Sequence, residues 1–196
     1  MTIKGPLTYL LGYEKLKLIK FFLNNQGEWF PIAELSERTK ISTTELRKEL
    51  KQALKYGVVE EEKQDKILHY KIRDIAEIKV LEDVIFNLGD TFFDSLEEKI
   101  QTVGDVHLCI LQGVFLQRDH DRVDLFMVVD DLDEKKFERL VTAVESELGT
   151  ELRYSVIDLK DFEYRKNMFD KFVWGILEDT RTKILVDKSS VIDDNI

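Results

Sequence analysis

Two amphipathic helical segments, residues 31–40 and 42–57, follow one another with only a tight turn between them. In the first segment, Pro31 suits the first helical turn, because the backbone N–H that proline lacks would have no partner within the helix there. Its inward-facing residues are expected to be Ile32, Ala33 and Leu35. Because the turn is short, the two helices must pack close together, and this restricts the folds that the chain can adopt.

The second segment carries signals for both of its ends. Ser42 can cap the first turn, and Glu45 stands three residues later, where its side chain completes a capping box. Gly57 follows the last helical residues and easily accepts the left-handed conformation that ends a helix. The expected buried stripe consists of Leu46, Leu50, Ala53 and Leu54.

The flanking segments complete a familiar order. Residues 14–25 predict an amphipathic helix with its lysines opposite the apolar side, which consists of Leu16, Ile19, Phe22 and Leu23. Residues 58–72 predict two short strands around a polar turn. From Tyr13 to Arg73 this order resembles the winged-helix DNA-binding domain. Lys40 departs from the pattern, since many such turns carry a glycine, and we expect it to be left-handed at a cost of about 1 kcal/mol.

The resemblance assigns DNA contacts to polar residues of the second helix and of the hairpin. The amino-terminal positions that would read bases are Thr43, Thr44, Arg47 and Lys48. The positions that would contact phosphates are Lys51 and Lys55 on the helix and Lys63 and Lys66 on the hairpin. Glu45, Glu49 and residues 60–62 are acidic and would repel phosphates. They leave open the alternative that this domain docks onto a protein.

The charge is unevenly distributed along the chain, and its distribution favours DNA binding by the first domain. The net charge is −10, yet residues 1–74 carry 14 Lys and Arg against 11 Asp and Glu, a net of +3. The remaining residues carry 15 against 28, a net of −13. The basic charge therefore coincides with the helices expected to bind DNA.

We expect three parts: a winged-helix domain over 1–74, a helical connector over 75–103 and a second domain over 104–196. In the connector, apolar residues recur every three or four positions, and this spacing predicts one long helix or two helices bent near Gly89. The residues of this stripe are Ile78, Leu81, Ile85, Leu88, Phe92, Leu96 and Ile100. This stripe needs a partner, and regulators that read two half-sites usually dimerise, so a homodimer is expected.

Location follows from two further features. No stretch approaches the roughly 18 apolar residues of a membrane span, and the first residues lack a secretory pattern, so we expect a cytoplasmic protein without membrane contact.

Cys109 lies in an apolar run without a cysteine or histidine at metal-ligand spacing, and it is expected to be a core residue.

The second domain alternates strands and helices. Strands are predicted over 106–112, 123–130, 151–158 and 183–186, with a helix over 134–149 and one or two helices over 161–179. Asp133 is the expected cap of the first of these helices. The whole chain is thus expected to be α+β, with a winged helix-turn-helix followed by an α/β domain.

Residues Leu108 to Val186 resemble the minimal nucleotidyltransferase domain of the DNA polymerase beta superfamily. That family has a Gly-Ser pair for phosphates and, about ten residues later, an Asp-x-Asp pair that binds magnesium. The matching residues here are Gly113, Val114, Arg122 and Asp124, so the serine and the first aspartate are replaced.

The replacements predict a degenerate nucleotide site. A guanidinium at Arg122 should pair with Asp124 and take the place of a cation. Glu151 is a weak candidate for a third carboxylate, and Asp119 and Asp121 could serve only if the strand register shifted. We expect no catalytic residues, no metal and no cofactor, although Arg122 and Arg118 could still hold a nucleotide or another phosphate-bearing ligand.

The sequence as a whole favours a DNA-binding transcriptional regulator with a pseudoenzyme domain, used for dimerisation or ligand sensing. One alternative is an active nucleotidyltransferase, antitoxin-like, that modifies a protein or a small molecule. The other is a scaffold in which both domains bind protein.

Overall fold

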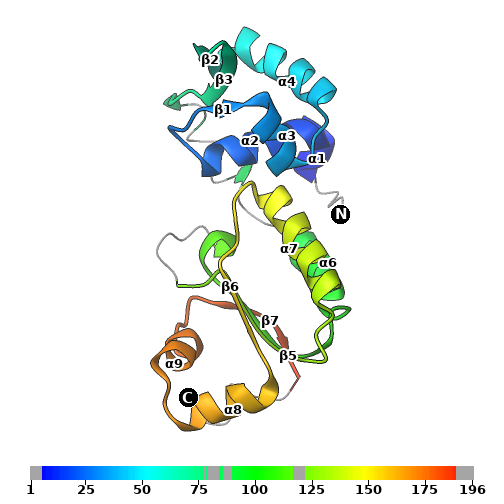
Figure 1. The fold of residues 1–196 in the computed structure, drawn as a ribbon, viewed down its shortest axis with the longest axis vertical. Coiled ribbons are helices and arrows are strands. Elements are labelled where there is room, and N and C mark those ends of the chain that lie inside the picture. Colours follow the sequence, from blue (N-terminus) through cyan, green and yellow to red (C-terminus); the bar gives the residue numbers. More distant parts are fainter. Residues whose placement is uncertain (1–5, 77, 79–83, 86–89, 117–121, 189–196) are drawn as a thin grey trace. The chain divides into compact units, whose positions relative to one another are not determined.

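The computed structural model describes residues 6–76, 78, 84–85, 90–116 and 122–188 (Figure 1). Within these residues the chain forms eight α-helices and two β-sheets, which confirms the α+β prediction. None of the described helices is long and apolar enough to cross a membrane. The chain divides into two compact units, one of residues 1–89 with 142–151, and one of residues 90–141 with 152–196.

Over the described residues 6–75, the first unit contains four helices and a three-stranded antiparallel sheet. The helices are α1 (Pro6–Leu11), α2 (Tyr13–Asn24), α3 (Ile32–Thr39) and α4 (Thr43–Lys55). The strands are β1 (Phe30–Pro31), β2 (Val59–Gln64) and β3 (Ile67–Ile72), in the sheet order β1-β3-β2. The expected hairpin is therefore present, and β1 adds a third strand that the sequence did not indicate.

Local signals explain where α3 ends and where α4 begins. The Ser42 hydroxyl accepts the N–H of Glu45 at 3.2 Å and donates to its carboxylate at 2.7 Å, so the capping box is confirmed. Lys40 is left-handed with φ 57°, as expected. Two expectations for α3 are wrong: Pro31 lies in β1 and precedes the helix, and Ala33 is exposed.

The core of the first unit is built around aromatic residues. The rings of Phe21 and Phe30 meet edge to face at 4.8 Å, and the Arg38 guanidinium covers both. Ile78 and Ile85 belong to the same core. The first part of the expected connector thus contributes to this core, while the expected bend near Gly89 falls outside the described residues.

The second unit is built on a mixed four-stranded sheet, ordered β6-β5-β4-β7. Its strands are β4 (Asp105–Leu111), β5 (Leu125–Asp130), β6 (Tyr154–Ile157) and β7 (Lys183–Asp187). Only the β5–β6 pairing is parallel. The helices are α6 (Asp90–Ile100), α7 (Glu134–Leu148), α8 (Leu159–Asn167) and α9 (Lys171–Leu177). A short 3₁₀ turn covers Gly113–Leu116.

The central strands β4 and β5 are buried on both faces. Ile110 and Phe126 pack with Phe162 of α8 and Val173 of α9. Cys109 has no exposed surface, and this burial raises the pKa of its thiol, so the expectation of a core cysteine is confirmed. Asp133 caps α7 by accepting the N–H of Lys136 at 3.0 Å, again as expected.

The last turns of α7 belong to the first unit. Glu147 accepts a hydrogen bond from the Tyr13 hydroxyl of α2, and the Asn25 amide donates to the Gly149 carbonyl at 2.8 Å. Lys17, which the sequence places opposite the apolar side of α2, is buried near Glu147. Burial lowers the pKa of Lys17, and the Glu147 carboxylate partly offsets this effect.

Candidate functional site

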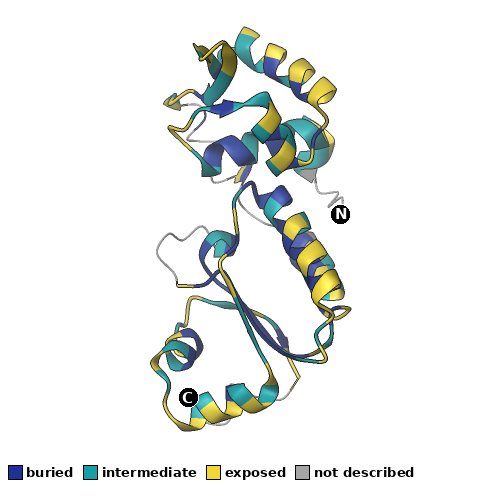
Figure 2. Ribbon diagram, in the orientation of Figure 1, coloured by how far each residue is buried: buried dark blue, intermediate teal, exposed yellow. Residues whose placement is uncertain are grey.

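The outer face of α4 gathers the residues expected to read DNA bases. Thr43, Thr44, Arg47 and Lys48 are all exposed, and so are Lys51 and Lys55 further along the helix. Figure 2 shows this exposed side of α4, while Leu46 and Leu50 on the inner side are buried. The helix therefore presents a polar and basic face that its own core contacts hold rigidly in place.

The β2–β3 hairpin carries the other expected contacts. Gln64 pairs with Ile67, so its turn consists of Asp65 and Lys66, which are both left-handed. A two-residue turn of this kind matches the twist of the strands. Lys63 and Lys66 are exposed near the tip of the hairpin.

Some of the acidic residues of α4 and of the hairpin bind neighbouring groups. Glu45 is engaged in the α4 capping box, and Glu60 forms an ion pair with Lys71 at 2.9 Å. Glu61 and Glu62 remain exposed on β2. Two of the residues expected to repel phosphate are therefore tied to neighbouring groups of the same unit.

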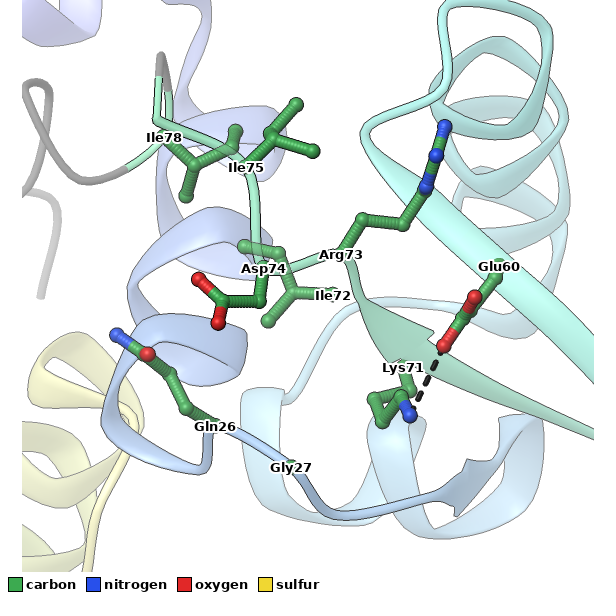
Figure 3. Close-up of a pocket in the computed structure, with 9 residues that line it drawn as sticks. All are labelled: Gln26, Gly27, Glu60, Lys71, Ile72, Arg73, Asp74, Ile75 and Ile78. Carbon is green, nitrogen blue, oxygen red and sulfur yellow. Dashed lines mark ion pairs between the residues drawn. The ribbon is translucent and has the colours of Figure 1, made fainter.

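A pocket of about 470 Å³ lies between the α2–β1 loop, the base of the hairpin and the segment after β3 (Figure 3). Its basic residues already have partners. Lys71 pairs with Glu60 and also lies over the Trp29 ring at 4.6 Å, while Arg73 donates to the Gly57 carbonyl at 3.4 Å. These contacts stabilise the base of the hairpin.

Asp124 is one of the residues expected to form the degenerate nucleotide site, and it is only 2% exposed. One carboxylate oxygen accepts the Val114 N–H at 3.0 Å, and the other accepts the Arg153 N–H at 2.9 Å. The Arg153 guanidinium forms a second pair of bonds, at 3.0 and 3.1 Å. Four donors thus occupy the carboxylate, which joins the loop after β4 to the start of β6.

Gly113 is required by this arrangement. It is left-handed with φ 51°, and a side chain at this position would overlap the Asp124 carboxylate. Gly113 and Asp124, both expected to belong to the degenerate nucleotide site, therefore depend on each other sterically.

The expected ion pair between Arg122 and Asp124 is wrong. Arg122 is exposed, and the ion pair of Asp124 runs to Arg153 instead. The physical reason is the parallel β5–β6 pairing, which places Leu125 opposite Tyr154 and hence brings position 153 beside position 124. Arg118, Asp119 and Asp121 lie outside the described residues.

The third expected carboxylate is not part of this site. Glu151 is exposed, whereas Asp124 is buried and its carboxylate accepts hydrogen bonds from Val114 and Arg153. Among the described residues, no group of three or more His, Cys, Asp or Glu side chains could hold a metal ion.

Two important residues were missed from the sequence. Arg153 could have been found by asking which basic residue stands level with Asp124 on the neighbouring strand. Glu147 gives no local signal, because its partners Tyr13 and Lys17 lie more than a hundred positions earlier in the chain.

Comparison with known proteins adds no relative: no family model, no curated protein and no solved structure matches this chain.

Proposed function

We propose that this chain is a DNA-binding transcriptional regulator whose first unit is a winged helix, with α4 as the recognition helix. The observation that carries the proposal is the exposed basic face of α4, within the element order α2, β1, α3, α4, β2, β3. A helix of this kind enters the major groove with its amino-terminal residues at the base edges.

The proposal gives different roles to residues along α4. Arg47 lies in the second turn and can form a bidentate pair with a guanine edge. Lys51 lies one turn later and is placed to neutralise a phosphate, as Lys63 and Lys66 are on the hairpin. Arg47 should therefore determine sequence preference, while the lysines determine overall affinity.

The test begins with selection of binding sites from a pool of randomised duplexes by the full chain. Affinity for the selected duplex and for an unrelated one is then measured by fluorescence anisotropy at several salt concentrations. Arg47→Ala should lower discrimination between the duplexes by about 1–3 kcal/mol. Lys51→Ala should weaken both duplexes alike and reduce the salt dependence.

Lys160→Ala is the matched control, because Lys160 is an exposed lysine on α8 in the other unit. It should leave both affinities unchanged. A pool that yields no enriched sequence, or equal effects of all three variants, would refute the recognition-helix assignment.

We further propose that the second unit is a degenerate nucleotidyltransferase-like domain. The order β4, β5, α7, β6 supports this, as does Gly113 packed against Asp124. Asp124 already accepts four hydrogen bonds within the unit, so a metal could reach it only by displacing Arg153. Arg122 is exposed and remains a candidate contact for a phosphate-bearing ligand.

The corresponding assay incubates the chain with each labelled nucleoside triphosphate, magnesium or manganese, and a cell extract as the source of acceptors. We expect no transfer that depends on Asp124. Label transfer that disappears in an Asp124→Ala variant with a preserved fold would establish the active nucleotidyltransferase instead.

Dimerisation remains part of the proposal, on the argument that regulators commonly read two half-sites. The connector stripe no longer supports it: Ile85 joins the first core, and Phe92 and Leu96 are buried within the same chain. Leu88 lies outside the described residues. Sedimentation equilibrium at micromolar concentration decides the matter, and a monomer would end this part of the proposal.

A further inference from the structure

A second cavity of the first unit lies behind α4, on the side opposite the proposed DNA contacts. Its volume is about 230 Å³, and its walls come from α2, from α4 and from the segment that leads into β2. The apolar walls are formed by Leu18, Ile19, Phe22, Ala53, Val58, Val59 and Ile72. Several of these are core residues, so the cavity has a well-packed and rigid base.

One charged group at this cavity lacks a full set of partners. Glu49 of α4 lines the cavity, and its Oε2 atom is buried without accepting a hydrogen bond from any of the described residues. Lys15 of α2 forms a long ion pair with that oxygen, with its Nζ at 4.0 Å, beyond hydrogen-bond distance, and the Glu49 side chain is 16% exposed. The Lys15 side chain is 44% exposed.

This combination favours one kind of ligand. A buried carboxylate oxygen without a donor is costly, and a ligand that donates to it gains the full benefit of a charge-assisted bond. The apolar walls favour a hydrocarbon body beside that donor. Since a cavity of about 150 Å³ holds benzene, this cavity suits a ligand of about nine non-hydrogen atoms.

We propose that this cavity binds a small primary amine with an apolar body, whose ammonium group donates to Glu49 Oε2. Lys15 is half solvated and turns toward water as the ammonium group enters. The proposal concerns the cavity alone and does not rest on DNA binding by α4.

The test uses the full chain and phenethylamine, an amine with an aromatic body of the required size. Methyl ¹H–¹³C spectra are recorded during titration. We expect shifts at the methyl groups of Leu18, Ile19 and Ile72, which line the cavity, and no shifts at Val173 and Ile176 in the other unit. Ethylbenzene and hydrocinnamate, which replace the ammonium by hydrogen and by a carboxylate, are titrated in the same way.

Variants connect the binding to the two features of the cavity. Glu49→Gln keeps the shape and removes the charge, and it should weaken the amine at least about tenfold. Ala53→Leu fills the cavity and should abolish the shifts, while unchanged methyl signals of Leu35, a core residue of the same unit outside the cavity, show that this unit is folded. Glu45→Gln, on the same helix but outside the cavity, preserves the capping box and should change the affinity by less than about twofold.

Each possible result of these titrations either supports or overturns the proposal. Amine-specific shifts that are lost with Glu49→Gln support the proposal. Equal binding of ethylbenzene and the amine, preferential binding of hydrocinnamate, or the absence of shifts at the lining methyl groups would each overturn it.

Discussion

Replacing Asp124 with asparagine distinguishes a structural carboxylate from an unused metal ligand. In the structure the two carboxylate oxygens accept four hydrogen bonds from Val114 and Arg153, and the side chain is 2% exposed. Asparagine has the same shape, but it is neutral and turns an NH₂ group toward one of these donors. We therefore expect Asp124→Asn to destabilise the chain.

The size of this effect follows from the exposure of the two partners. Removing one partner of a buried ion pair costs about 3–5 kcal/mol, because the other charge is left without compensation. Here the Arg153 side chain is 54% exposed and keeps contact with water, which places the expected loss near the lower limit, at about 3 kcal/mol.

The assay is urea unfolding of both proteins, followed by circular dichroism, with and without magnesium. Asp161→Asn is the matched control, since Asp161 pairs with Arg165 at 2.9 Å while both side chains are well solvated, and it should cost far less. A carboxylate that served only as a metal ligand could be replaced without loss of stability in the absence of magnesium. If Asp124→Asn were as stable as the unmodified chain without magnesium, the structural role of Asp124 would be refuted.

Three further predictions concern single residues. Gly149→Ala should cost about 2 kcal/mol in thermal or urea unfolding, because Gly149 has φ 79° and a side chain there would overlap the Phe21 backbone; an unchanged midpoint would contradict this packing. Ser42→Ala should cost about 1 kcal/mol in the same measurement through loss of the α4 cap, and no change would mean that the cap is not formed in solution. The Leu159 N–H, and then the His107 side chain, lower the pKa of Asp130 below its ordinary value of 3.8. The stability that Asp130 contributes is thus present above that value and is lost as the pH falls through the lower, folded-state pKa, so Asp130→Asn should flatten this part of the stability–pH curve.

The elements that could be predicted are those whose signals lie within a few residues. The capping box marks the start of α4 after Ser42, and the continuous apolar run of residues 125–129 marks a buried strand. The strand β1 has two residues and is defined only by its pairing with Tyr70 and His69 on β3, so no local pattern reveals it.

The Asp124 site was predicted in part for a related reason. The spacing of Gly113 and Asp124 is visible along the chain, whereas the choice between Arg122 and Arg153 depends on strand pairing. Residues i and i+2 are close in sequence, and this made Arg122 the natural partner. The parallel β5–β6 register decides for Arg153, and such a register is set by the whole sheet.

The place of Glu147 and Gly149 in the first unit has a consequence for the order of events during synthesis. Residues 6–76 emerge early with their helices and hairpin already encoded, yet the Tyr13 hydroxyl donates to Glu147 and the Asn25 amide also donates to the Gly149 carbonyl, and both acceptors are made much later. Domains generally fold as units while the chain is being made, from the amino terminus onward. Here the first unit begins to form early, but it is completed only after about half of the second has been translated.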